Sequence, residues 1–264
     1  MTNVETLTSN RNPLLKDIRR AIIRGSITES GSAVAETFHL LEEALKSDCQ
    51  IEAVIAAQSV RKMVEVHIGG LRNVRLIVVP DGLFEELSAT ESSQGVMALV
   101  RMPIWTIDQL LRSQPLLVLL DGLQDPGNAG SIARTAEAFG ATGIIFLKGT
   151  VSPFNPKTLR ASAGSLFRLP FMAGLDTELA LAALKHRKVD LYAAMPKAVK
   201  RVDKVDLTRR AAIIIGSEGR GVSRILEHAS TDLAISTNGV ESLNAAVAAG
   251  ILLYEARRQR SLQE

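Results

Sequence analysis

The sequence predicts an α/β protein of two domains: a larger C-terminal domain with a mostly parallel sheet and a smaller N-terminal α/β domain. Three observations support this fold class. The chain has 264 residues, which is long for a single domain. Short apolar runs alternate with helix-compatible segments along most of its length. Pro103 and Pro115 bracket a short joint, so we predict domains at 1–104 and 115–264 with a linker at 105–114.

The N-terminal domain is predicted to contain two helices and three strands. Residues 1–9 are polar, and we expect them to be frayed. Apolar residues recur at intervals of four from Leu14 to Ile22, which predicts an amphipathic helix over 13–24. A second helix is predicted over 34–46. The predicted strands are the short apolar runs 51–56, 76–79 and 95–100.

The C-terminal domain is predicted to alternate strands with helices. Residues 116–120 are apolar without alternation, as in a strand that is buried on both faces. A helix over 129–139 follows and stops at Gly140, a suitable C-terminal cap. Further strands are predicted at 144–147, 191–195 and 211–215, and further helices at 157–167, 179–188 and 244–257. This alternation predicts a mostly parallel sheet covered on both faces.

The composition excludes several classes of protein. No apolar run approaches the roughly 20 residues of a membrane span, and the first residues lack the layout of a signal peptide. Cys49 is the only cysteine, which excludes disulfide frameworks and thiolate zinc sites and makes a cytoplasmic location the expectation. The four histidines show no metal-ligand spacing, so no metal cofactor is expected.

Charge is unevenly distributed along the chain. The net charge is +3, but residues 1–110 hold 11 Lys and Arg against 14 Asp and Glu, whereas residues 111–264 hold 20 against 14. Within the acidic part, a basic cluster comprises Arg11, Lys16, Arg19, Arg20 and Arg24. Such a cluster suits a phosphate backbone, although a solvated helix face explains it equally well.

A glycine-rich loop, residues 120–134, follows the first buried strand of the C-terminal domain. Ligands of open α/β sheets bind where loops leave the carboxyl ends of strands. Asn128 is well placed to cap the next helix, and Arg134 lies about 200° round that helix from Ile132, so it points away from the core. The alternative to a binding site is a simple cap with Arg134 paired to Glu137 on the surface.

A second glycine-rich loop, residues 216–221, follows the strand at 211–215. It lacks the Lys-Ser/Thr ending of a nucleotide-triphosphate loop and the register of a dinucleotide fold. Glu218 at its centre would repel a phosphate and would suit a ligand that carries an amino group or a sulfonium. A plain turn with Glu218 near a helix N-terminus is the alternative.

A third polar segment, residues 235–244, precedes the last helix. Ser242 and Asn244 can cap that helix, which is their structural explanation. The small residues after them, from Ala245 to Gly250, would let another element approach the backbone closely. Three polar or glycine-rich loops that each follow a predicted strand indicate a binding site much more strongly than any one of them does.

These three segments resemble the motifs of the SpoU-type branch of the SPOUT superfamily, S-adenosylmethionine-dependent RNA ribose 2′-O-methyltransferases. The matching residues, in order, are Asn128, Gly130 and Arg134, then Gly216, Glu218 and Gly219, then Ser242, Leu243 and Asn244. The stretches 155–165 and 253–260 match as well. Residues 10–101 resemble the accessory substrate-binding domain of the family less closely.

The resemblance implies a fold, a co-substrate and a partner. The C-terminal α/β domain would be knotted as a trefoil, hold S-adenosylmethionine in the knot, and form a homodimer with composite active sites. The implied catalytic residues are Arg134, Asn128, Glu218, Ser242 and Asn244. The implied cofactor-binding residues are Gly216, Ser217, Gly219, Ile235, Leu243 and Asn244. The implied RNA-binding residues are Arg11, Asn12, Lys16, Arg19, Arg20 and Arg160.

The chain departs from the family pattern at two places. It has Ile235-Ser236-Thr237 where the family usually has Ile-Pro-Met, and Thr37 stands where the accessory domain usually has glycine. Neither change touches the matched catalytic positions. Because arginine does not normally deprotonate, we expect Arg134 to orient a phosphate at the ribose rather than to act as the base.

Ribosomal RNA is the expected substrate by analogy with the family. Transfer RNA is the alternative substrate, and a non-catalytic RNA-binding or ribosome-assembly protein with the same fold is the alternative function. The missing phosphate-loop lysine and dinucleotide motif make a third alternative, an ordinary nucleotide-binding enzyme, improbable.

Overall fold

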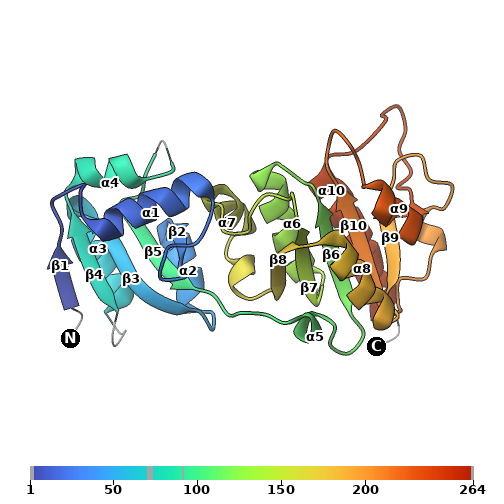
Figure 1. The fold of residues 1–264 in the computed structure, drawn as a ribbon, viewed down its shortest axis with the longest axis horizontal. Helices are drawn as coiled ribbons and strands as arrows, with labels where there is room; N and C mark the ends of the chain where they lie inside the picture. Colours follow the sequence, from blue (N-terminus) through green and yellow to red (C-terminus); the bar gives the residue numbers. More distant parts are fainter. Residues whose placement is uncertain (1–2, 70–73, 91, 263–264) are drawn as a thin grey trace. The chain divides into compact units, whose positions relative to one another are not determined.

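The structure of the chain is a computed structural model that describes residues 3–69, 74–90 and 92–262 (Figure 1). The chain divides into two compact units. The first unit comprises Met1–Ile104 together with Phe154–Arg168, and the second comprises Trp105–Pro153 and Leu169–Glu264. The predicted fold class, α/β with a parallel sheet in the C-terminal part, is confirmed. The segment 154–168, which the sequence assigned to the C-terminal domain, groups with the first unit.

The first unit contains a five-stranded mixed sheet. Its strand order is β1 (Asn3–Thr6), β4 (Arg75–Val79), β3 (Gln50–Ala57), β5 (Val96–Arg101), β2 (Ala33–Glu36). The three predicted strands are therefore confirmed. The expectation that residues 1–9 are frayed was wrong for β1, which pairs in parallel with β4. A strand edge offers unpaired backbone groups, and β1 satisfies those of β4.

In the described part of the first unit, helices α1 to α4 alternate with the strands along the sequence, and α7 belongs to the segment 154–168. They are α1 (Pro13–Arg24), α2 (Phe38–Leu45), α3 (Arg61–Ile68), α4 (Asp81–Leu87) and α7 (Pro156–Ser162). The predicted bounds of α1 are confirmed: the Asn12 side chain accepts a hydrogen bond from the Leu14 N–H at 2.9 Å, and Gly25 ends the helix with φ +59°. Leu15 and Ile18 of α1 pack with Phe84 of α4 on the sheet.

The predicted helix over 34–46 is interrupted, and this prediction was wrong in its first part. Residues 33–36 are all buried and pair antiparallel with β5, so they form a strand instead of the first helical turn. Thr37 then adopts φ +106° and ψ +151° before α2 begins. This region of backbone space is essentially restricted to glycine and costs other residues about 1–3 kcal/mol.

Replacing Thr37 by glycine is expected to stabilise the first unit by about 1 kcal/mol. The strain relieved is about 1–3 kcal/mol, and it is partly offset by the greater backbone entropy of glycine and by loss of the side-chain cap to the Leu40 N–H. Thermal unfolding should show a midpoint a few degrees higher. The matched control is Thr106→Gly, because Thr106 also precedes a helix but has an ordinary φ of −104°. This control should lower stability, and an equal loss for Thr37→Gly would contradict the strain argument.

The second unit contains a six-stranded sheet in which every described pairing is parallel. Its order is β11 (Thr231–Leu233), β9 (Asp190–Ala194), β10 (Ala211–Gly216), β6 (Leu116–Asp121), β7 (Gly143–Leu147), β8 (Phe171–Leu175). The four strands predicted in this part of the chain are confirmed. The outer strands β8 and β11 were missed because the first is half exposed and the second has only 3 residues.

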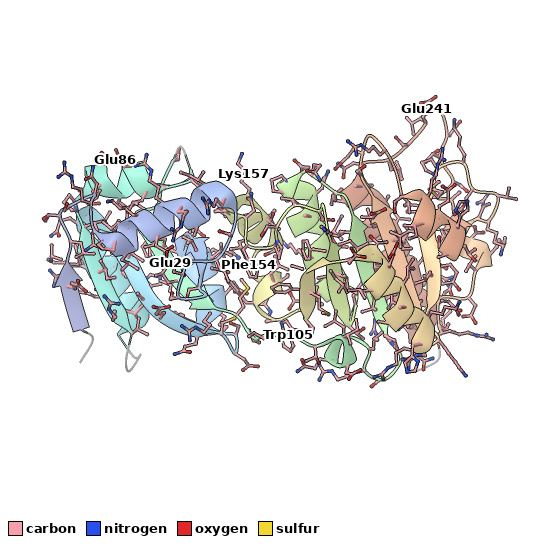
Figure 2. The ribbon with its side chains drawn as sticks, viewed as in Figure 1. Glu29, Glu86, Trp105, Phe154, Lys157 and Glu241 are labelled. Carbon is pink, nitrogen blue, oxygen red and sulfur yellow. The ribbon has the colours of Figure 1, made fainter. Side chains whose placement is uncertain are left out.

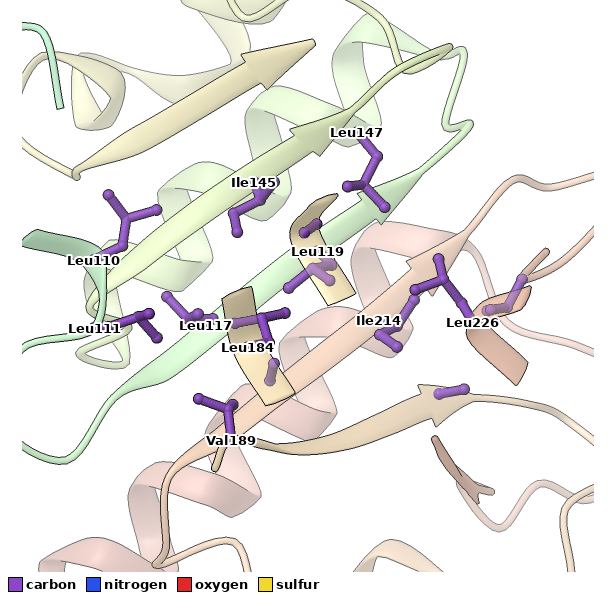
Figure 3. Packing of buried hydrophobic residues seen from close by; sticks show 14 residues of the cluster. Leu110, Leu111, Leu117, Leu119, Ile145, Leu147, Leu184, Val189, Ile214 and Leu226 are labelled. Carbon is purple, nitrogen blue, oxygen red and sulfur yellow. The ribbon is translucent and has the colours of Figure 1, made fainter. Parts of the chain in front are cut away.

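Helices cover both faces of this sheet. On one face, α5 (Ile107–Leu110), α8 (Thr177–His186) and α9 (Arg224–Ala229) contribute to an apolar cluster that Figure 3 shows, with Leu184 beside Leu117 and Leu226 beside Ile214. On the other face lie α6 (Pro126–Ala138) and α10 (Ala245–Ser261). Among the described residues no helix combines the length and apolar character needed to cross a membrane.

Helices α6 and α10 pack side by side in parallel. Thr135 of α6 lies against Gly250 of α10, and the rings of Phe139 and Tyr254 meet edge to face at 5.7 Å. Because the two helices run in the same direction, both begin at the same edge of the sheet. The polar residues at their N-termini are therefore brought together.

Arg260 fixes the other end of α10. Its guanidinium donates hydrogen bonds to the carbonyls of Gln114, Pro115, Leu207 and Arg209, at 2.6–3.1 Å. Burial lowers the pKa of Arg260 from its ordinary value. Arg260 therefore has a structural role, because its guanidinium satisfies backbone carbonyls next to the first residues of β6 and β10.

Candidate active site

Two of the three polar loops predicted from the sequence line one cavity in the second unit, and the third is hydrogen-bonded to residues of its wall. The cavity has a volume of about 350 Å³ and lies at the carboxyl ends of β9 and β10. Of the residues that the resemblance implied for cofactor binding or catalysis, those on its wall are Gly216, Ser217, Glu218, Ile235, Ser242, Leu243 and Asn244. Gly219 and Arg134 do not line it, and Asn128 reaches its edge through hydrogen bonds.

A chain of hydrogen bonds joins the three loops. The Asn128 Nδ2 donates to Glu218 Oε1 at 2.6 Å, and Asn244 Nδ2 donates to Asn128 Oδ1 at 3.0 Å. The Asn244 Oδ1 accepts from the N–H groups of Ala246 and Val247, at 2.9 and 3.3 Å. Each amide therefore uses both ends, which fixes its orientation. The Glu218 carboxylate is held at the cavity wall by this chain.

Asn128 is free for this role because another residue caps α6. The sequence placed Asn128 at the cap, which was wrong: Asp125 is the N-cap, and its carboxylate accepts from the Asn128 N–H at 2.6 Å. Pro126 occupies the first helical turn, where a missing N–H costs nothing. For α10 the cap is Asn244, and Ser242 lies exposed on the cavity wall without capping it.

The loop 216–221 is a tight turn closed by its own backbone. The Ser217 N–H donates to the Gly221 carbonyl at 3.1 Å, and the Gly221 N–H donates back at 2.9 Å. A Cβ built on Gly216 would lie only 2.2 Å from the Gly221 carbonyl carbon. Only glycine fits at position 216, since that neighbour is backbone and cannot rotate away. By contrast, a Cβ on Gly219 would meet no atom within 4 Å.

Several cavity residues were missed by the sequence reasoning. Ala194, Met195 and Pro196 leave the carboxyl end of β9, while Thr237 and Glu241 lie in the segment before α10. The predicted strand at 191–195 was a usable signal, because parallel neighbours end at the same sheet edge. Thr237 lines the wall together with Ile235, so the segment that departs from the Ile-Pro-Met pattern still borders the cavity.

Arg134 lies outside the cavity. It is exposed, six residues beyond Asn128 on α6, which places it ~9 Å further along the helix axis. The predicted direction, away from the core, is confirmed. Within the part of the chain that the structure describes, its guanidinium has no hydrogen-bond or ion-pair partner, so it is available to a group outside this chain.

The residues predicted to bind RNA all belong to the first unit. Arg11, Lys16 and Arg19 are exposed at or on α1. Arg20 is already paired with Asp17 and Glu29, at 2.5 and 2.6 Å, and the side-chain Oδ1 of Asn12 caps α1.

Arg160 of α7 is also engaged. Its Nη1 lies 2.7 Å from Oε2 of Glu36, which is only 3% exposed and whose other oxygen accepts from the Ala89 N–H at 2.7 Å. The Glu36–Arg160 pair neutralises a buried carboxylate, which gives Arg160 a structural role. Contact of Arg160 with RNA stays a prediction.

Two family models match the chain. The model of the SpoU rRNA Methylase family matches residues 115–254, which is more than half of the chain and contains all three polar loops. The chain belongs to the SpoU rRNA methylase family. The model of the MRM3-like substrate binding domain matches residues 12–98 of this SpoU methylase, in agreement with the predicted accessory domain.

The relatives of this SpoU methylase are RNA methyltransferases. It is 30% identical to the 23S rRNA (guanosine(2553)-2′-O)-methyltransferase RlmP of Bacillus subtilis, over 96% of this chain and 100% of that protein. It is 31% identical to a 23S rRNA (guanosine-2′-O-)-methyltransferase RlmB of Burkholderia, over 78% of this chain and 86% of the relative. The prediction of an RNA 2′-O-methyltransferase is thus confirmed at the level of the family.

Solved structures agree with this assignment. The SpoU methyltransferase AviRb of Streptomyces viridochromogenes, in complex with the cofactor AdoMet, superimposes with a TM-score of 0.84 at 27% identity and covers 95% of this chain and 99% of its own. An rRNA methyltransferase of Sinorhizobium meliloti gives a TM-score of 0.82 at 29% identity, with 97% and 98% covered. Among the described residues, no three His, Cys, Asp or Glu side chains lie close enough together to bind one metal ion.

Proposed function

We propose that this SpoU methylase transfers a methyl group from S-adenosylmethionine to a ribose 2′-hydroxyl of ribosomal RNA. The observation that carries the proposal is the hydrogen-bonded chain from Glu218 through Asn128 to Asn244, which joins three separate motifs at one cavity. Two relatives are named for 23S rRNA, which favours ribosomal RNA. A transfer RNA substrate is the alternative, because a further relative is named as a tRNA/rRNA methyltransferase.

The cavity suits the co-substrate in size and chemistry. About 350 Å³ falls within the range of small-molecule sites. Ile215, Leu233, Ile235 and Leu243 give it an apolar wall for the adenine, while the backbone at Gly216, Ile235 and Leu243 offers hydrogen-bonding groups. Ser217 and Glu218 supply polar groups for the methionine part. When bound, the sulfonium supplies an activated methyl group.

The chain must place the ribose in line with that methyl group. A hydroxyl is a weak nucleophile, so orientation and removal of its proton limit the reaction. Arg134 would hold the phosphate next to the reacting ribose, since a guanidinium binds phosphate bidentately and keeps its own protons. Ser242 and the Glu218–Asn128–Asn244 chain would position the loops around the hydroxyl.

A second copy of the chain would complete the site. The outer face of α10 carries an apolar stripe of Val247, Ile251 and Tyr254, which are 52%, 37% and 56% exposed. These residues recur at helical spacing on one side of α10, as in helices that pair with another subunit. Arg134 projects to solvent from the adjoining α6. A homodimer through this surface would let Arg134 of one protomer reach the cavity of its partner.

The first unit would bind the RNA outside the reacting nucleotide. Arg11, Lys16 and Arg19 are exposed on one segment and can contact phosphates. RNA ribose methylation is an activity of the cell interior, in keeping with a cytoplasmic location. We further propose that the substrate-binding domain ends at residue 104 and that the methyltransferase domain begins at residue 115. The backbone of the methyltransferase domain would be knotted.

The decisive experiment compares ribose methylation of ribosomal RNA from cells with and without the protein, followed by methylation of the unmodified RNA in vitro with labelled S-adenosylmethionine. One 2′-O-methyl group should be missing in the deletion strain and restored by the purified protein. Restored methylation in transfer RNA alone would favour the alternative substrate. If the purified chain neither binds S-adenosylmethionine nor modifies either RNA, the enzymatic proposal fails and a non-catalytic RNA-binding role is favoured.

A further inference from the structure

The charged side chains that line the cavity are all acidic. Two of its lining residues, Glu218 and Glu241, carry carboxylates, and among the described residues that line it none is Lys, Arg or His. Arg220 belongs to the same loop as Glu218 but does not line the cavity. A cleft lined by charges of one sign raises the local concentration of ligands of the opposite sign. The cavity therefore favours a cationic ligand for a reason that is independent of its shape.

Of these two carboxylates, Glu218 takes part in the hydrogen bonds that join the loops, whereas Glu241 does not. Glu218 accepts a hydrogen bond from Asn128 and belongs to the chain that orders the loops. Glu241 lies in the segment between β11 and α10, and Figure 2 shows it at the outer end of that loop. It is exposed and has no hydrogen-bond or ion-pair partner within the residues that the structure describes. Local structure does not require an acidic side chain at this position.

The reaction of the proposed function changes the charge of the molecule in the cavity. S-adenosylmethionine carries a sulfonium charge, and S-adenosylhomocysteine, which remains after methyl transfer, lacks it. The two molecules are otherwise nearly identical in shape. Apolar contacts and hydrogen bonds to the adenine and ribose therefore cannot distinguish them, whereas a carboxylate on the wall can.

We propose that Glu241 is a specificity-determining residue that, together with Glu218, makes the cavity bind the cationic methyl donor in preference to its neutral product. This inference rests on the proposed function. It gives Glu241 a role in product release: when the methyl group leaves, the attraction between the wall and the ligand weakens. A lower concentration of S-adenosylmethionine is then enough to replace the neutral product than would be needed if the cavity bound both molecules equally.

The test is calorimetric binding of S-adenosylmethionine and S-adenosylhomocysteine to the full-length protein and to its Glu241→Gln variant. The affinity for S-adenosylmethionine should fall about threefold to fivefold, the effect of one exposed charge pair, while that for S-adenosylhomocysteine stays the same. Sinefungin, which carries an amine in place of the sulfonium methyl group, should follow S-adenosylmethionine. Added salt should reduce the donor preference of the unmodified protein more than that of the variant.

Two further variants control this experiment. Glu86→Gln removes the same charge from an exposed position in the first unit and should leave both affinities unchanged. Glu241→Asp keeps the charge and should retain most of the preference. Equal weakening of both ligands by Glu241→Gln, or no change in either, would overturn the inference. If the unmodified protein binds neither ligand, the proposed function itself fails, so the two failures are distinguishable.

Discussion

Replacing Arg134 by alanine is expected to reduce methyl transfer by at least about a hundredfold while leaving the affinity for S-adenosylmethionine nearly unchanged. The reduction follows from loss of the group that orients the reacting ribose. The affinity is retained because Arg134 does not line the cavity. Single-turnover transfer of labelled methyl groups to ribosomal RNA measures the first quantity, and calorimetry measures the second.

The same variant needs a control for surface charge. Arg112→Ala removes an exposed arginine of the second unit whose Nε donates to the Gln109 carbonyl, and it should retain near-normal transfer. Arg134→Lys should recover a part of the activity, because lysine keeps the charge but not the bidentate geometry. Full activity of Arg134→Ala would remove this residue from the mechanism.

Replacing Gly216 by alanine is expected to abolish measurable binding of S-adenosylmethionine. The new Cβ would lie 2.2 Å from the Gly221 carbonyl carbon and 2.3 Å from the Val222 nitrogen. Because both atoms belong to the backbone, the loop 216–221 must open, and overpacking of this kind costs roughly 1–3 kcal/mol in stability. Calorimetric titration and thermal unfolding measure the two effects.

Gly219 offers a matched control within the same loop. An added Cβ there would meet no atom within 4 Å, so Gly219→Ala should bind the donor with an affinity close to that of the unmodified protein. If both variants lose binding equally, the loop depends on glycine for flexibility and not on the close approach at position 216. If neither loses it, the cavity is not the donor site.

The site residues that could be predicted from the sequence are the polar residues placed at the carboxyl ends of parallel strands or at the start of the next helix. Glu218 and Asn244 follow strands or begin helices of a parallel sheet, so their convergence follows from the rule that such ends share one edge. The cap of α6 was not predictable in the same way, because Asp125 and Asn128 are both good capping residues and only the position of Pro126 decides between them. Glu241 was missed since an exposed loop carboxylate has no local signature.

The fold of the first unit was harder to predict for a related reason. Residues 33–36 have a composition that both a helix and a strand accept, and the antiparallel partner that selects the strand lies about 60 residues later, in β5. The edge pairing of β1 and the grouping of segment 154–168 with the first unit also depend on contacts that are distant in sequence. Local periodicity carries no information about such partners.

The parallel packing of α6 and α10 has a kinetic consequence. Asn128 and Asn244 are separated by 116 positions, and Asn128 and Glu218 by 90, so the donor cavity requires the closure of very long loops. Contacts of such separation form slowly during folding. Until the residues beyond Glu218 have been synthesised, the emerging polypeptide lacks β11 and the segment 235–244, so one wall of the cavity does not yet exist.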